Sequence, residues 1–124
     1  MNVFEKWKAI TEYKDFIFDG RYEVSNWGNV RISKTKQKMN PFFNKEGGYL
    51  KLRLIDKNKV RQTLYIHQLV AWNFVGIPND NQEVNHKDGN KQNNSFSNLE
   101  WVTPIENIRH FHKAKREAKL LQGE

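Results

Sequence analysis

The sequence predicts an α+β protein in which antiparallel β-hairpins and a short core helix come first, and a further hairpin and a long helix come last. Three observations carry this prediction. Apolar and polar side chains alternate through residues 49–55, as they do on a half-buried strand. The alternation disappears in residues 67–75, which are almost wholly apolar and typical of a core helix. A helix start, Thr103-Pro104-Ile105-Glu106, directly follows a short apolar segment.

The first hairpin is predicted around the turn sequence SNWGN. Tyr22 and Val24 precede this turn, Val30 follows it, and Gly28 can supply a positive φ. Upstream, residues 5–10 form a short run in which Trp7 is a candidate core side chain. Residues 31–38 are basic and polar, and we expect the exposed end of the hairpin or a loop there.

The second hairpin is predicted over residues 49–66, with a turn at residues 56–59. Its first strand places three leucines on one side and Lys51 and Arg53 on the other. The cationic side could meet a phosphate backbone, and it could equally be the solvated face of an antiparallel sheet. The alternation leaves both interpretations open.

The apolar helix over residues 67–75 is expected to end at Gly76 and Pro78. His67 stands at its start. An imidazole there can cap the helix or be satisfied in the core, and direct contact with DNA is the other interpretation.

Polar chemistry is concentrated in residues 85–107. Two short strands, over residues 83–86 and 99–102, flank a loop rich in turn-forming residues, where Asp88 is expected to shape the turn rather than to bind a metal. Leu99 and Trp101 are expected core residues. On the helix after Thr103, apolar residues recur at helical spacing and should pack inward: Ile108, Phe111, Ala114, Ala118 and Leu121. Arg109, His112, Lys113 and Arg116 should then face outward.

Composition narrows the class of protein. The formal net charge is +7, and residues 31–61 hold ten Lys or Arg against two acidic residues, with a second basic cluster in residues 109–119. Such patches suit a polyanion, most simply nucleic acid, although a solvated surface has the same composition. The absence of Cys excludes disulfides and thiolate zinc sites. No apolar run approaches about 20 residues, so we expect a soluble, intracellular protein with no membrane partner.

We expect one compact folding unit with two regions. Residues 1–66 would form a basic, β-rich DNA-binding region, and residues 67–124 the region that carries the chemistry. Within the second region, His86 lies at the end of a strand beside a turn, where it can activate water. Asn98, on the returning strand, could bond to the imidazole or its backbone, and Asn107, one turn into the helix, can point back at the hairpin.

The ordering His86, Asn98, Asn107 resembles the motif of the HNH nucleases, whose β-hairpin and following helix grip one metal ion in a ββα-metal fold. Over about residues 5–112, the chain resembles phage and intron homing endonucleases of the HNH class. Those enzymes carry a small N-terminal nuclease-associated DNA-binding module. The residues that carry it outside the motif are Trp7, residues 22–26, Gly28, Val30, residues 48–49, 67–71 and 98–103.

The resemblance implies a role for each motif residue. His86 would be the general base, Asn98 would orient it and support the loop, and Asn107 and Asn85 would bind one divalent cation, Mg²⁺ or Mn²⁺, with DNA phosphate oxygens. It also implies cleavage that leaves a 5′-phosphate and a 3′-hydroxyl. We expect phosphate contacts from Arg31, Lys51, Arg53, Arg109, Lys113 and Arg116.

Two features depart from the family pattern. Asn85 stands where related enzymes often have Asp or His, and Asn107 replaces a frequent His, so that two neutral amides would form the metal shell. The metal would then bind tightly only with DNA, or a neighbour such as His110 would take part. In addition, Asn85 and His86 are adjacent on a strand and should point to opposite faces unless the strand ends or distorts there.

From these observations and this resemblance, the sequence predicts a homing-type HNH endonuclease that acts on double-stranded DNA, and it leaves open whether one strand is nicked or both are cut. The alternative is an HNH-like DNA-binding module that does not cut. We expect a monomer of modest specificity, with a dimer possible, in the cytoplasm of a bacterial host if the gene belongs to a phage or an intron.

Overall fold

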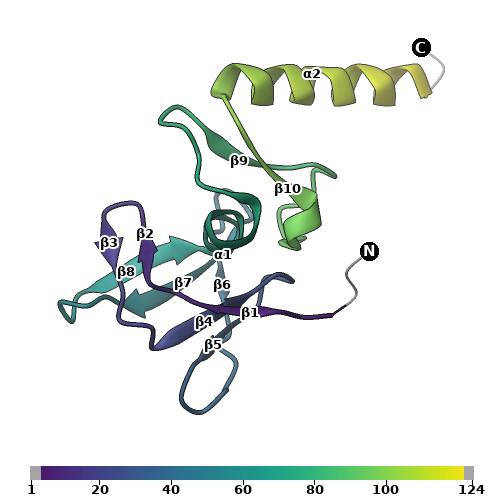
Figure 1. Ribbon diagram of the computed structural model, residues 1–124. Coiled ribbons are helices and arrows are strands. Elements are labelled where there is room, and N and C mark those ends of the chain that lie inside the picture. Colours follow the sequence, from purple (N-terminus) through teal and green to yellow (C-terminus); the bar gives the residue numbers. More distant parts are fainter. Residues whose placement is uncertain (1–3, 122–124) are drawn as a thin grey trace.

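The computed structural model describes residues 4–121, and within the last helix it describes the side chains of residues 104–109, 112, 113 and 116. Strands β1 to β8 lie on one side of the central helix α1, while the ribbon β9-β10 leads away from it to helix α2 (Figure 1). The predicted α+β class, with hairpins first, then a short helix and a ββα unit, is confirmed.

The first sheet has the order β1-β4-β5 and is antiparallel. Its strands are β1 (Trp7–Ala9), β4 (Tyr22–Ser25) and β5 (Val30–Ile32). The predicted hairpin is present, with Val24 opposite Val30 and Gly28 at φ +94° in the turn. The Ser25 hydroxyl closes that turn by accepting from the backbone N–H of Trp27 and Asn29 at 3.2 and 3.1 Å.

The prediction that Trp7 is a core anchor was wrong. Trp7 is only half-buried on the edge strand β1, and the guanidinium of Arg31 lies over its ring, 3.8 Å from the centroid. Ile10, just after the strand, is fully buried instead. Successive side chains of a strand point to opposite faces, and on β1 the Trp7 side chain lies on the face that the core does not fully cover.

A minor hairpin and a second main sheet follow. They comprise β2 (Glu12–Tyr13) with β3 (Phe16–Ile17), and β6 (Phe42–Phe43), β7 (Leu50–Ile55) and β8 (Arg61–Tyr65) in the order β6-β7-β8. The predicted second hairpin is confirmed, with Leu52 opposite Leu64. Leu52 and Leu54 are buried, and Arg53 is exposed on the other face.

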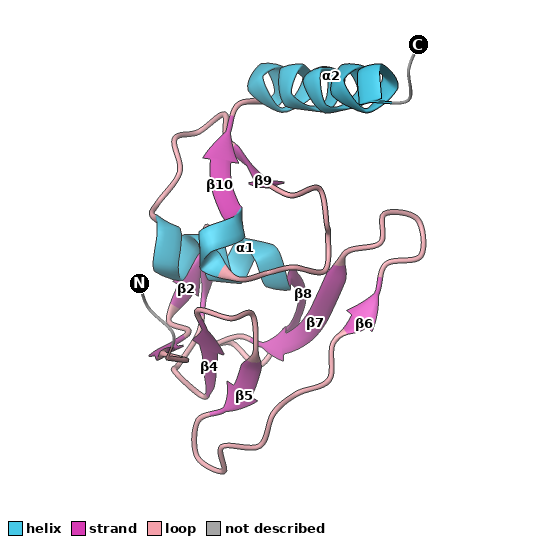
Figure 2. Cartoon of the chain, turned by 90° about the vertical axis from the view of Figure 1, so that its right-hand side faces the viewer, coloured by secondary structure: helices cyan, strands magenta, loops and turns pink. Residues whose placement is uncertain are grey.

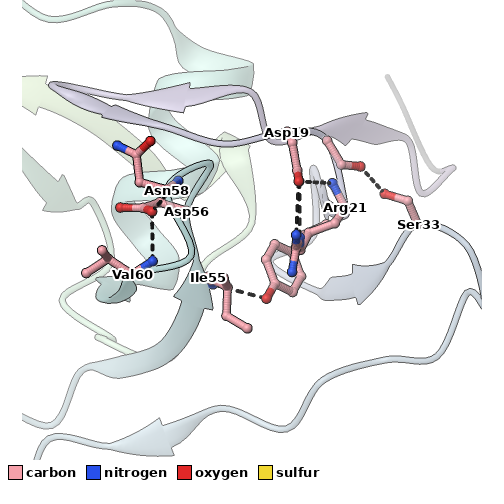
Figure 3. Close-up of polar contacts among 9 residues, drawn as sticks. Asp19, Arg21, Ser33, Ile55, Asp56, Asn58 and Val60 are labelled. Atoms are coloured by element: carbon pink, nitrogen blue, oxygen red, sulfur yellow. Dashed lines mark hydrogen bonds and ion pairs between the residues drawn. The ribbon is translucent and has the colours of Figure 1, made fainter.

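Polar contacts join the two main sheets and close their turns (Figure 3). The Tyr22 hydroxyl, from β4, accepts from the backbone N–H of Ile55 on β7 at 3.0 Å. The Asp56 carboxylate accepts from the N–H groups of Asn58 and Val60 at 2.8 and 3.0 Å, which shapes the β7–β8 turn. The N-terminal strands therefore form a connected support beneath α1.

The predicted apolar helix begins at Ile66 and has two parts. Helix α1 (Ile66–Val70) continues as a π-helical turn, η1 (Ala71–Val75), whose Ala71 carbonyl accepts from the N–H of Gly76 at 3.0 Å. Gly76, at φ +151°, ends it as predicted. Leu69, Val70 and Ala71 are completely buried, so this segment is the centre of the core.

The C-terminal unit follows the predicted boundaries. Strands β9 (Glu83–His86) and β10 (Leu99–Val102) form an antiparallel ribbon, preceded on the β10 side by an unpredicted 3₁₀ turn, η2 (Phe96–Asn98). Helix α2 (Pro104–Leu121) starts at the predicted capping box: Thr103 Oγ1 accepts from the N–H of Glu106, and the Glu106 carboxylate accepts from the N–H of Thr103, both at 3.2 Å.

Helix α2 lies across the far end of the ribbon in both views (Figures 1 and 2). The prediction that Ile108 packs inward was wrong, because its exposed fraction is 56% and the helix projects beyond the core. The other residues expected to pack inward, Phe111, Ala114, Ala118 and Leu121, have side chains outside the described part of the chain.

One continuous apolar core links the strands to the ribbon. Leu54 and Leu64 from the β-rich part, Leu69 and Val70 from α1, and Leu99 from β10 belong to the same buried cluster.

The division into regions 1–66 and 67–124 stays a prediction. Within residues 4–121, none of the helices is long and apolar enough to cross a membrane.

Candidate active site

His86 ends strand β9, and its imidazole points into the protein. Only 6% of the residue is exposed, and its ring centroid lies 5.1 Å from that of His67 and 5.9 Å from that of Tyr49. Its Nε2 atom lies 2.8 Å from Oδ1 of Asn94. Burial lowers the pKa of His86, and the hydrogen bond to Asn94 opposes this shift. The imidazole is thus favoured in the neutral form, which a general base requires.

Asn98 does not hold the imidazole. Its side-chain amide donates to the Asp88 carboxylate and to the Asn93 carbonyl, both at 2.9 Å, and its Oδ1 accepts from the N–H of Asp88 at 3.0 Å. Its backbone carbonyl accepts from Lys87 N–H, next to His86, at 2.8 Å. Asn98 therefore braces the loop, while the side-chain partner of His86 is Asn94, which sequence reasoning missed among several loop asparagines.

Asp88 shapes the loop, as expected. Its carboxylate accepts from the side chains of Asn93 and Asn98 and from the N–H of Asn90, and the Asn93 and Asn90 hydrogen bonds are the main causes of its lowered pKa. The loop is also anchored to the first sheet, since the N–H of Phe96 donates to the Asn26 carbonyl at 2.8 Å. The loop next to His86 is thus fixed from both halves of the chain.

Asn85 and Asn107 belong to a second group of polar residues. Asn85 lies opposite Glu100 in the ribbon, and its amide donates to the Glu100 carboxylate at 2.8 Å. Asn107, in the first turn of α2, donates to the Glu83 carboxylate at 2.9 Å. Glu83 and Asn85 share one face of β9, two residues apart.

The ribbon is regular through this region, with His86 opposite Leu99 and Asn85 opposite Glu100. Strand alternation therefore places His86 and Asn85 on opposite faces, as the sequence predicted for an undistorted strand. The structure brings Asn85, Glu83, Glu100 and Asn107 together on one face. The imidazole of His86 lies on the other, at the residue where the strand ends.

The second group fits a hard divalent cation in the chemistry of its donors. Amide and carboxylate oxygens are the ligands that Mg²⁺ and Mn²⁺ prefer. Among the described residues, no three His, Asp or Glu side chains are arranged to share a metal. The oxygen donors of this group are the two amides together with Glu83 and Glu100. Sequence reasoning did not identify these glutamates, because it searched only the motif positions.

His67 is buried behind His86, which matches the core interpretation of this residue. Its exposed fraction is 7%, its Nδ1 atom is buried without a hydrogen-bond partner, and burial lowers its pKa to about 3. Its ring packs against those of Tyr49 and Tyr65, at 4.8 and 5.4 Å. The structure thus places His67 in the core beside His86, with little of its side chain at the protein surface.

The candidate phosphate contacts differ in their surroundings. Arg31 is held by Glu23 at 2.7 Å and by the ring of Trp7, and its side chain is only 20% exposed. Lys51 and Arg53 lie over the ring of Phe42, at 5.4 and 5.7 Å from its centroid. On α2, the described side chains of Arg109, Lys113 and Arg116 are exposed, while that of His110 lies outside the described part.

Comparison with known proteins identifies the family to which the chain belongs. A family model described as HNH endonuclease matches residues 64–109, and a model of the NUMOD4 motif matches residues 5–55. A solved structure titled "DNA binding and cleavage by the HNH homing endonuclease I-HmuI" matches with a TM-score of 0.73 and 34% identity, over 94% of this chain and 68% of that chain. The chain belongs to the HNH endonuclease family.

Individual relatives extend this assignment. The DNA endonuclease I-HmuI of Bacillus phage SP01 is 37% identical over 103 residues, which is 83% of this chain and 55% of that protein. The uncharacterized HNH endonuclease L245 of Acanthamoeba polyphaga mimivirus is 40% identical over 101 residues, or 82% of this chain and 30% of that protein. A putative HNH homing endonuclease, YosQ, from a Bacillus subtilis (strain 168) prophage is 40% identical over 84 residues, covering 68% and 49%. The chain spans between 30% and 55% of the length of these relatives.

Proposed function

We propose that this protein is a metal-dependent, homing-type endonuclease that hydrolyses a phosphodiester of double-stranded DNA and nicks one strand, leaving a 5′-phosphate and a 3′-hydroxyl. The observation that carries the proposal is a buried, hydrogen-bonded His86 at the end of β9, together with a group of oxygen donors on the opposite face of the same ribbon. The family and its solved relative, which is titled as cleaving DNA, support it.

His86 acts in this proposal as the general base. Its neutral imidazole takes the proton of a water molecule as that water attacks phosphorus. The ring is held on one side by Asn94 and packed against His67 and Tyr49, so it has little freedom to turn away. Asn98 contributes by keeping the loop after His86 in place.

Asn107 and Asn85, together with Glu83 or Glu100, would hold one Mg²⁺ or Mn²⁺ ion, and DNA phosphate oxygens would complete its shell. Such a cation would supply positive charge that stabilises the extra negative charge formed during cleavage. The Glu100 carboxylate accepts a hydrogen bond from the Asn85 amide, and the Glu83 carboxylate accepts one from the Asn107 amide. Negatively charged carboxylates therefore lie beside the two neutral amides. His110 stays a candidate supporting residue on the same helix.

DNA would lie along the cations on the polar face of β7 and the exposed cations of α2. Lys51 and Arg53 share the polar face of β7, and Arg109, Lys113 and Arg116 are exposed on the helix that follows the ribbon. None of these five side chains forms an ion pair with another residue that the structure describes, so each can contact a phosphate without first breaking one. Arg31, already paired with Glu23, is better suited to support the first sheet.

Plasmid nicking tests the function. Supercoiled DNA is incubated with Mg²⁺ or Mn²⁺ and with the wild type, His86→Ala or Asn107→Ala, and DNA binding is measured in parallel. We expect the wild type to produce open circles, His86→Ala to lose cleavage but keep DNA binding, and Asn107→Ala to need more metal. Binding by the wild type without cleavage at any metal concentration would leave the non-cutting DNA-binding module as the function.

The form in which the protein acts is part of the proposal. We propose a monomer of modest specificity, because one module of this size covers little DNA. Sedimentation of the protein with a DNA duplex gives the stoichiometry. A stable dimer on DNA, or a unique site of about 15 or more base pairs for a monomer, would overturn it.

A further inference from the structure

Asn94 and His86 form a buried hydrogen-bonded pair within the loop of the ββα unit. Their exposed fractions are 4% and 6%, and Oδ1 of Asn94 lies 2.8 Å from Nε2 of His86. An amide oxygen can only accept a hydrogen bond, so the shared hydrogen belongs to Nε2. A neutral imidazole has one N–H, and its lone pair is then on Nδ1.

The position of Asn94 is set by the N-terminal half of the chain. Gly28, in the β4–β5 turn, lies so close that a Cβ atom there would be 2.9 Å from Cβ of Asn94 and 3.2 Å from its carbonyl oxygen. Two residues further along the loop, the N–H of Phe96 donates to Asn26, which lies in the same turn. The turn therefore packs closely against the loop at Asn94 and is hydrogen-bonded to it at Phe96.

The other side of the imidazole is closed by rings. Tyr49 and His67 lie against His86, and the ammonium group of Lys91 lies over the ring of Tyr49 at 5.0 Å from its centroid. These contacts restrict the plane of the imidazole but do not choose which nitrogen carries the hydrogen. Asn94 is the described side chain whose hydrogen bond makes that choice.

We propose that Asn94 is the positioning residue of His86: by accepting from Nε2–H, it keeps Nδ1 as the basic nitrogen and holds the ring in the orientation that cleavage requires. This inference rests on the proposed role of His86 as the general base. Asn94 thereby takes the orienting role expected of Asn98, and Asn98 keeps the loop-supporting role. Through Gly28, the β-rich half also supports the catalytic geometry.

The test uses substitutions that differ in hydrogen bonding at nearly constant size. Asn94→Asp keeps an acceptor oxygen at the same position, and Asn94→Leu removes it. Gln92→Ala, at an exposed position of the same loop, is the control. For each protein, the ¹⁵N shifts of the His86 ring in long-range ¹H–¹⁵N spectra report which nitrogen carries the hydrogen, independently of any activity.

We expect the Nε2–H form in the wild type, in Gln92→Ala and in Asn94→Asp, and a mixture of both forms in Asn94→Leu. Single-turnover nicking by Asn94→Leu should be slower by on the order of 10²-fold with unchanged DNA affinity, since the imidazole is no longer held in one tautomer and orientation while the DNA surface is kept. Asn94→Asp should recover most of this rate.

Two results would overturn the proposal: an Nδ1–H form in the wild type, or an unchanged Nε2–H form in Asn94→Leu. The first is read from the unaltered protein, so it decides the matter even if Asn94→Leu does not fold. If the wild type shows the Nε2–H form and binds DNA without cutting it, the proposed function fails while the placement of the hydrogen by Asn94 stands.

Discussion

The amide of Asn85 donates across the β9-β10 ribbon to the carboxylate of Glu100, with 2.8 Å between Nδ2 and Oε2. This contact bears on the main departure of the chain from its family pattern, the neutral residue at position 85. A negative charge stands directly beside that residue on the opposite strand. The cation site can therefore have a carboxylate although position 85 has none.

Glu100→Gln should weaken Mn²⁺ binding in the presence of DNA by about tenfold or more, because the substitution removes the negative charge nearest to Asn85. Calorimetric titration of Mn²⁺ into the protein bound to an uncleavable phosphorothioate duplex measures the affinity. Glu46→Gln, at an exposed position before the β7 strand, is the charge-matched control. Equal Mn²⁺ affinities of the two variants would exclude Glu100 as a ligand.

Asn98→Ala should destabilise the fold by about 1–3 kcal/mol, because it removes a buried amide that makes three hydrogen bonds to Asp88 and Asn93 in the loop. Chemical denaturation measures the loss. Gln92→Ala, whose side chain is exposed on the same loop, should change stability by less than about 0.5 kcal/mol. Similar stabilities for both variants would contradict the bracing role.

Gly28→Ala should cost more stability than Gly20→Ala, although both glycines have a positive φ, +94° and +84°. The backbone conformation penalises both substitutions by about 1–2 kcal/mol. The new methyl group meets Asn94 only at position 28, since nothing lies within 4 Å of a Cβ at position 20. Thermal denaturation compares them, and a perturbed His86 ring signal is expected for Gly28→Ala alone. Equal losses of stability in the two variants would show that the β4–β5 turn does not pack against the loop at Asn94.

Stability should fall below about pH 6.5 because of His67. Its pKa is about 3 in the folded protein, lowered chiefly by burial, against 6.5 ordinarily, so protons bind preferentially to the unfolded chain between these values. The stabilisation is complete above pH 6.5 and decreases as the pH falls, by about 1.4 kcal/mol at pH 5.5. Denaturation measured above pH 6.5 and at pH 5.5 should show a smaller loss of stability between the two for His67→Phe than for the wild type. An identical pH dependence in this variant would refute the assignment.

Lys51→Gln and Arg53→Gln should each reduce the salt dependence of DNA binding by about one released counterion, because the half-buried Lys51 and the exposed Arg53 share the polar face of β7. Binding measured over a range of salt concentrations gives the slope. Arg31→Gln is the contrasting variant: it breaks the contact with Glu23 and should lower stability while leaving the slope unchanged. A slope change for Arg31→Gln alone would place the DNA on the first sheet instead.

Local patterns predicted the elements of this protein well, because each depends on residues that are neighbours in the chain. The alternation through β7 and the Thr103–Glu106 capping box predicted their elements directly. The same patterns failed for Trp7 and Ile108, which are apolar but not buried. Periodicity assigns a side chain to a face, and only packing decides whether that face is covered.

The sequence by itself determined the order of the main hairpins and helices, since these follow from local spacing and composition, and its resemblance to the HNH nucleases indicated the family. Tertiary structure decided which side chains meet: Asn94 rather than Asn98 at the imidazole, and Glu100 beside Asn85. The contact of Gly28 with Asn94 joins segments from opposite halves of the chain. Such contacts arise only when the core has brought the β-rich half against the ribbon, so no local pattern contains them.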